Sequence, residues 1–178
     1  MLTRGGEAVK VSKRTGKSIT LSNLLDEVPI DAARFFFNMR EPNIHLEFDL
    51  ELAVSQNSQN PVYYVEYAHA RICSILRDLG ETGTPKTTTN LEPSEKALLM
   101  CVAEFPEIVA DAAKRYDPSK ITKYLMNLAM LFHKFYTECR VKNEDKEIEN
   151  LRAAILRSAK TTIKNALALL KIDAPEQM

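Results

Sequence analysis

The sequence is poor in the residues that mark disulfide-linked, metal-binding and membrane proteins. It has no tryptophan, three cysteines and three histidines among 178 residues. Neither the cysteines nor the histidines form a close pair such as C-x-x-C, which argues against a zinc site and a disulfide framework. No apolar run approaches the ~18 residues of a membrane span, and the N-terminus lacks the apolar core of a signal peptide. We therefore expect a cytoplasmic protein without a metal site or a membrane partner.

The sequence also has no excess of positive or negative charge. The 24 basic and 24 acidic residues cancel, so any nucleic-acid site must be a local patch rather than a property of the whole surface. The apolar content is ordinary for a globular protein and is sufficient for a real core. Each cysteine falls in a helical apolar pattern and is interpreted as a small core residue: Cys73, Cys101 and Cys139.

Helical patterns dominate after the first 20 residues. Caps, prolines and apolar spacings of three and four predict the segments. The predicted helices cover 22–28, 31–39, 49 to about 60, 61–79, 93–104, 106–116, 118–139 and 145–170, with a linker over 81–91. Asp31 is interpreted as a helix cap, and His69 and His133 are interpreted as structural histidines with satisfied hydrogen bonds. The sequence thus predicts a mainly α fold, a helical bundle.

The first residues differ from this pattern. Met1–Thr3 and Ala8–Val11 flank a Gly-Gly pair, which predicts a β-hairpin. An isolated hairpin is marginal in water, so it is expected to belong to a larger sheet outside this chain.

A basic segment follows the hairpin. Residues 10–17 contain four cations, two hydroxyls and a glycine, a composition that suits a polyphosphate. The segment is not a P-loop, because the G-x-x-x-x-G-K-[ST] pattern is absent. On composition alone, a solvated basic tail or a localisation patch remains open.

The predicted helix over 61–79 has two distinct faces. At about 100° per residue, Val65, Ala68 and Ile72 share the face expected in the core. Tyr64, Tyr67 and Arg71 fall on a neighbouring face. Two rings and a guanidinium in a row suit unpaired nucleobases, although the tyrosines could instead widen the core stripe.

Several strings carry a resemblance to a known family. Lys10-Val11-Ser12-Lys13-Arg14 resembles the K-M-S-K-S loop of class I aminoacyl-tRNA synthetases, with Val11 for Met and Arg14 for the last Ser. Residues 60–71, N-P-V-Y-Y-V-E-Y-A-H-A-R, resemble the N-P-V-Y-Y-V-Q-Y-A-H-A-R string of arginyl-tRNA synthetases. Further matches are D-A-A-R at 31–34, F-H-K-F-Y at 132–136 with C-R-V at 139–141, and A-P-E-Q-M at 174–178. The resemblance covers the whole chain.

This resemblance implies two functional parts. Residues 1–48 would be the end of a class I catalytic domain, in which Lys10, Ser12 and Lys13 act catalytically and Lys10, Lys13 and Arg14 bind ATP, used with Mg²⁺. Residues 49–178 would be a DALR-type anticodon-binding domain whose tRNA(Arg) contacts are Tyr64, Tyr67, Arg71, Arg140 and Met178. The implied partners are the tRNA(Arg) anticodon loop and an upstream catalytic domain, with no DNA.

The chain contains no H-I-G-H-like string, so we expect it not to charge tRNA alone. Two other readings remain. The zero net charge and the run Phe35–Phe37 would fit a helical protein-interaction module without RNA binding. A complete small nucleotide-binding enzyme is disfavoured because no base, nucleophile or metal cluster accompanies the basic segment.

Overall fold

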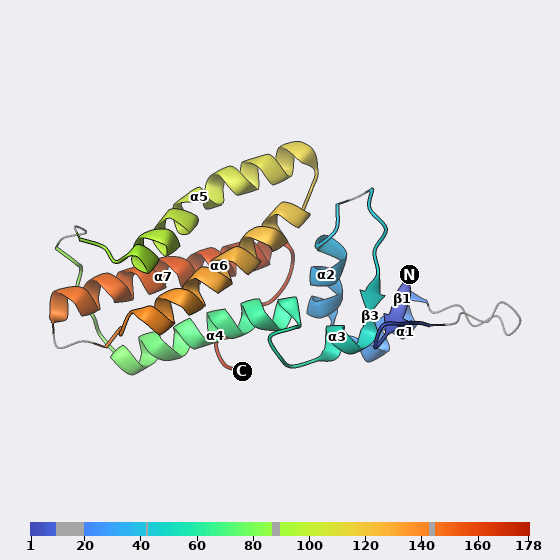
Figure 1. Cartoon of the computed structure of the whole chain (residues 1–178), viewed down its shortest axis with the longest axis horizontal. Helices are drawn as coiled ribbons and strands as arrows, with labels where there is room; N and C mark the ends of the chain where they lie inside the picture. Colours follow the sequence, from blue (N-terminus) through green and yellow to red (C-terminus); the bar gives the residue numbers. More distant parts are fainter. Residues whose placement is uncertain (10–19, 42, 87–89, 143–144) are drawn as a thin grey trace, which may run out of the picture.

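The protein is a mainly helical molecule with a small sheet near its N-terminus (Figure 1). The computed structural model describes residues 1–9, 20–41, 43–86, 90–142 and 145–178. Its helices are α1 (Leu21–Glu27), α2 (Ile30–Asn38), α3 (Leu50–Val54), α4 (Pro61–Leu79), α5 (Pro93–Arg115), α6 (Ser119–Glu138) and α7 (Lys146–Leu169). Its strands are β1 (Leu2–Arg4), β2 (Glu7–Ala8) and β3 (Phe48–Asp49). The predicted mainly α class is confirmed.

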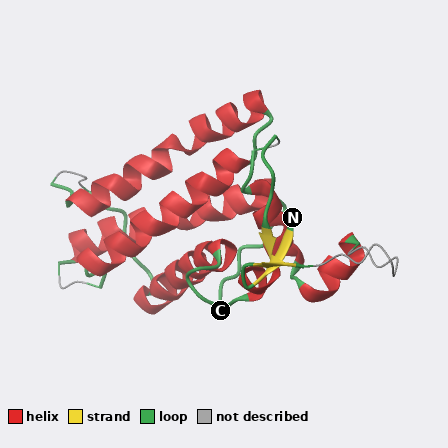
Figure 2. Cartoon of the chain, turned by 45° about the vertical axis from the view of Figure 1, so that its right-hand side comes forward, coloured by secondary structure: helices red, strands yellow, loops and turns green. Residues whose placement is uncertain are grey.

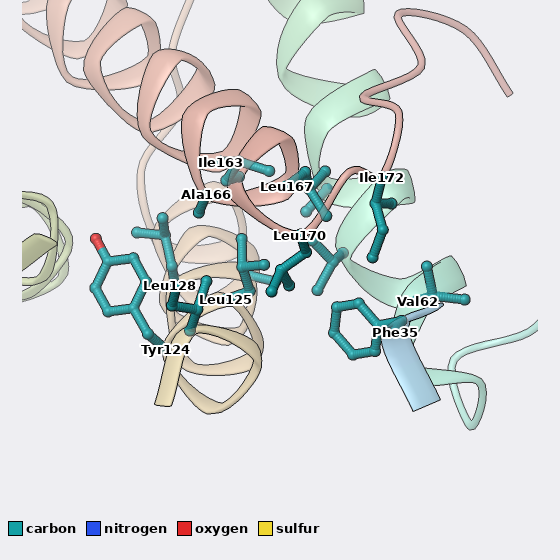
Figure 3. Close-up of a cluster of buried hydrophobic side chains, with 14 of the residues drawn as sticks. Phe35, Val62, Tyr124, Leu125, Leu128, Ile163, Ala166, Leu167, Leu170 and Ile172 are labelled. Atoms are coloured by element: carbon teal, nitrogen blue, oxygen red, sulfur yellow. The ribbon is translucent and has the colours of Figure 1, made fainter. Parts of the chain in front are cut away.

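The four long helices α4 to α7 form an elongated bundle, and the sheet with α1, α2 and α3 lies at one end of it (Figures 1 and 2). The bundle encloses apolar side chains from all four helices. Figure 3 shows a part of this core in which Phe35 of α2 and Ile172 after α7 lie with side chains of α4, α6 and α7. Phe35, Leu125 and Leu167 are fully buried. Burial of this apolar surface is the main force that holds the bundle together.

The N-terminal hairpin is confirmed and acquires a third strand. β1 pairs antiparallel with β2 through a turn in which Gly5 and Gly6 have φ of 57° and 84°, a region that glycine enters at little cost. β3 then pairs parallel with β1, and Phe48 N donates to Met1 O at 2.8 Å. The sequence predicts only an irregular or extended segment for residues 43–48. β3 is two residues long and is set by pairing with the distant N-terminus, which local sequence does not encode.

One predicted helix boundary, the end of the helix that begins after Asp49, is wrong. The helix beginning after Asp49 ends at Val54 instead of about residue 60. The Asn60 amide donates to the carbonyls of Ala53 and Ser55 at 3.2 and 2.8 Å, and its side-chain oxygen caps α4 at Val62 N. Asn60 thus donates to free carbonyls at the end of α3 and caps the start of α4.

The predicted break before Pro106 and the predicted cap at Asp31 are also wrong. α5 continues through Pro106. Proline removes one intrahelical bond, but the adjacent Phe105 ring stacks on Tyr124 of α6 at 5.4 Å, so tertiary packing holds the helix next to the proline. α2 begins after Pro29, and Asp31 lies in its first turn, where its carboxylate accepts a hydrogen bond from Asp173 N at 3.3 Å.

The cysteines and the linker follow the expectations. All three cysteines are buried thiols, as predicted. The linker over 81–91 is non-helical where the structure describes it. In the described part of the chain, no helix has the length and apolar character to cross a membrane. The boundary predicted between residues 48 and 49 falls inside β3, and one buried core contains side chains from both sides of it.

Candidate nucleic-acid interface

The first turns of α4 carry a row of aromatic rings on the side of the bundle next to α6. The Tyr63 and Tyr67 rings stack at 6.4 Å with 10° between their planes, and Tyr67 stacks on His133 of α6 at 5.9 Å. Tyr64 contacts the same imidazole at 4.8 Å. These four residues and Ser58 line a hollow of about 440 Å³. Tyr67 is 43% exposed, so its ring is available to a stacking ligand.

A guanidinium follows one turn further along α4. Arg71 donates a hydrogen bond to the Tyr136 hydroxyl at 2.6 Å, and its Cζ lies 5.0 Å from the centre of that ring. Both contacts hold the planar group, because arginine stacks on aromatic rings as well as donating. Arg71 and Tyr136 line a cleft of about 510 Å³ between the C-terminal halves of α4 and α6.

The same cleft brings Arg140 beside Arg71, although the two residues are distant in sequence. Arg140 follows Cys139, which ends α6, and its side chain is exposed. The Arg140 carbonyl accepts a hydrogen bond from Arg152 at 2.8 Å, which ties this backbone to α7. With Lys142, the cleft has three cations against the carboxylates of Asp78 and Glu138. The local charge is therefore positive although the chain is neutral.

Met178 lies in a neighbouring groove. The groove has a volume of about 360 Å³, and its lining includes Tyr63 and Glu66 of α4 together with Met178. Tyr63 therefore lines both this groove and the aromatic hollow. The chain reaches the groove by passing from the end of α7 back to α4, beside which it ends (Figure 1).

Burial tunes the titratable groups here toward their neutral forms. It raises the pKa of the Tyr64 hydroxyl and lowers the pKa of His133. The hollow is thus an uncharged stacking surface at neutral pH. In the groove, burial first and then the charges of Asp31 and Asp173 raise the pKa of Glu66 to about 7. Among the described residues, no group of three His, Cys, Asp or Glu could hold a metal ion.

The structure brings together five predicted contact residues in three adjoining depressions. Tyr64 and Tyr67 share the hollow, Arg71 and Arg140 share the cleft, and Met178 occupies the groove. The predicted phosphate-loop residues Lys10, Ser12, Lys13 and Arg14 lie outside the described residues.

Sequence reasoning missed Tyr63, His133 and Tyr136 as members of this surface. The last two are three residues apart on α6, a spacing that places them on one face, but nothing local showed that this face meets α4. The expectation of satisfied histidines is wrong in one respect. The Nε2 atoms of His69 and His133 are buried without a hydrogen-bond partner in the part of the chain that the structure describes.

Comparison with known proteins gives a consistent result. Residues 65–178 match the family described as the DALR anticodon binding domain. The chain is 51% identical to an arginine–tRNA ligase of Shouchella clausii over 99% of this chain and 33% of that relative. It is 48% identical to the arginine–tRNA ligase of Caldanaerobacter subterraneus, with the same coverage of both chains. The chain thus spans about a third of the length of the curated relatives it matches.

Solved structures of arginyl-tRNA synthetases share this fold. A putative arginyl-tRNA synthetase from Campylobacter jejuni superposes with a TM-score of 0.86 at 33% identity, covering 99% of this chain and 39% of that one. The Thermus thermophilus arginyl-tRNA synthetase superposes with a TM-score of 0.80 at 26% identity, covering 99% and 34%.

Proposed function

The chain belongs to the DALR anticodon binding domain family, and from this premise we propose that it is the C-terminal region of an arginine–tRNA ligase and binds the anticodon loop of tRNA(Arg). Tyr64, Tyr67, Arg71, Arg140 and Met178 would make the contacts. The observation that carries the proposal is the continuous row of rings and guanidinium groups along α4 and the end of α6.

The chemistry of this row suits a single-stranded loop. Tyr67, backed by His133, offers a ring face to an unstacked base. Arg71 keeps donors beyond the one used by Tyr136, since a guanidinium has five N–H groups. Those donors can meet a base edge, while Arg140 supplies a charge for the phosphate backbone. The surface therefore combines base contact with backbone attraction.

We further propose that residues 10–14 serve the ATP-dependent step of the complete enzyme. Lys13, supported by Lys10 and Ser12, would stabilise the charge that develops on the phosphates, and Arg14 would add to ATP binding with Mg²⁺. This proposal rests on the K-V-S-K-R string. The step also needs groups for arginine and adenosine that a catalytic domain outside these residues would provide, so the chain alone is expected not to charge tRNA.

Exposed apolar residues support such a neighbouring domain. Leu21, Ile30 and Phe37 are each about half exposed or more, and all three lie on α1 and α2 beside the small sheet. Another protein surface packed on α1 and α2 would cover these exposed apolar side chains. We propose that the upstream catalytic domain packs there.

One titration tests the RNA role. Anticodon stem-loops of tRNA(Arg), identical except for the middle anticodon base, are titrated into the chain at fixed salt, because affinity for RNA depends on ionic strength. We expect the affinity to depend on that base and to fall as salt rises. Equal, weak binding of every loop would favour a protein-interaction module instead.

A further inference from the structure

A hydrogen bond from a buried histidine holds the chain after α7 on α4. His69 lies in α4 and is completely buried, and its Nδ1 is 2.8 Å from the carbonyl oxygen of Pro175. A carbonyl can only accept, so Nδ1 must carry the hydrogen and donate it. The imidazole tautomer is therefore set by the C-terminal segment. Nε2 is then an unprotonated, buried nitrogen without a partner among the described residues.

This tautomer leaves the histidine with a single strong bond. The nearby Cys73 Sγ is 3.8 Å from the same Nδ1, which is a weaker contact, and a nitrogen that already donates to Pro175 cannot accept from the thiol. Burial lowers the pKa of His69 and keeps the ring neutral. Burying a polar side chain with one unpaired atom costs free energy of folding. The bond to Pro175 is the contact that offsets this cost at His69.

The other contacts of the segment are more exposed. Glu176 pairs with Lys160 at 3.1 Å, and Arg77 donates to the Glu176 carbonyl at 3.5 Å. Asp173 N donates to Asp31 at 3.3 Å. Solvent-exposed pairs of this kind contribute little and are screened by salt. Pro175 is only three residues before Met178, so this bond is the anchor nearest to the end of the chain that has a completely buried donor.

We propose that His69 is a positioning residue that fixes the C-terminal segment, residues 173–178, so that Met178 stands beside Tyr63 at the RNA-binding surface. The anchoring concerns the chain itself, whereas its consequence for RNA rests on the proposed function. In a chain without the bond, residues 175–178 would leave the groove for part of the time. The RNA would then have to order them on binding, which lowers affinity.

Asn and Gln at position 69 test which ring nitrogen is the donor, because each carries an amide N–H group at the position of a different imidazole nitrogen. The Asn amide in His69→Asn reaches the position of Nδ1, whereas the Gln amide in His69→Gln reaches toward Nε2. The full chain is labelled with ¹³C-methyl methionine, and the Met178 signal is assigned by its loss in Met178→Leu. We expect the Met178 methyl to sharpen and shift toward its unfolded position in His69→Gln and to stay near its native position in His69→Asn. Cys73→Ser is the matched control and should leave the signal unchanged.

RNA binding provides the second readout. His69→Gln should weaken binding of the anticodon stem-loop about five- to tenfold, the effect of one net hydrogen bond. A chain ending at Asp173 should bind as weakly, with no further loss when His69→Gln is added to it. This truncation also keeps the test decisive if the buried substitution unfolds the protein, which circular dichroism detects.

The outcomes separate the two proposals. An unchanged Met178 signal in His69→Gln, or equal loosening in His69→Asn, overturns the anchor. A full further loss of affinity when His69→Gln is added to the truncated chain shows that His69 acts through the bundle and also overturns it. If His69→Gln releases the segment but the unsubstituted chain binds no RNA, the proposed function is rejected. The anchor then stands without an RNA role.

Discussion

Arg152 of α7 and Glu95 of α5 form an ion pair inside the bundle, with 2.6 Å between Nε and Oε1. Their side chains are 12% and 3% exposed. The second Glu95 oxygen accepts from Glu92 N at 2.8 Å, and Arg152 also donates to the Arg140 carbonyl. The pair thus joins the start of α5, the second turn of α7 and the backbone of a proposed RNA contact.

Removing one member of this pair should be costly. Glu95→Ala leaves the Arg152 guanidinium buried without its counter-charge, for which the expected loss is about 3–5 kcal/mol in the free energy of unfolding. Urea denaturation measures it. Glu27→Ala is the matched control, because Glu27 pairs with Arg4 at 2.6 Å but both side chains are more than half exposed. That pair should contribute less than about 1 kcal/mol. Equal losses would contradict the assignment of Glu95–Arg152 as a buried pair.

Removal of the stacking rings should weaken RNA binding without unfolding the helix. Tyr67→Ala, or Tyr64→Ala combined with it, is expected to reduce affinity for the anticodon stem-loop about tenfold or more, because stacking contributes roughly 1–3 kcal/mol per base. Fluorescence anisotropy gives the affinity, and circular dichroism should show unchanged helix. Tyr116→Asn is the control: Tyr116 is highly exposed at the end of α5 with φ of 53°, which Asn tolerates. Unchanged affinity in the double variant would remove the role of both tyrosines.

A charge contact with phosphate should differ from a base contact. Arg140→Gln is expected to weaken all stem-loops by a similar factor. It should also reduce the slope of log K against log salt by about 0.7–0.9, the value for one phosphate contact. Titrations at four salt concentrations measure the slope. Arg115→Gln, on α5 away from the cleft, should leave the slope unchanged. A change in base preference with an unchanged slope would instead place Arg140 at a base.

The fold should become less stable as pH rises because of Glu66. Its pKa rises from 4.5 to about 7 in the folded protein, chiefly through burial. Between those values the folded state holds a proton that the unfolded state has released, so this contribution is complete below about pH 4.5 and is lost by pH 7. Glu66→Gln mimics the protonated form. It should therefore raise the melting temperature more at pH 8 than at pH 5, measured by calorimetry, and an equal gain at both values would refute this account.

Local sequence was sufficient for the features that depend on neighbours in the chain. Asn60-Pro61 begins α4 and Gly80 ends it, because capping and proline act within a few residues. The spacing of Tyr64, Tyr67 and Arg71 placed them on one side of that helix, as the structure has them. The Gly-Gly turn likewise encoded the hairpin.

Tertiary structure decided the features that join distant segments. Pro106 is an ordinary helix breaker, yet α5 continues because the adjacent Phe105 packs on α6. Tyr136 and His133 became part of the surface only when α6 packed beside α4, and the Pro175 carbonyl selected the tautomer of His69. Backbone propensity acts over one or two turns, whereas these contacts depend on which faces the whole bundle buries. For that reason the row along α4 could be predicted from the sequence, and the partners that hold it could not.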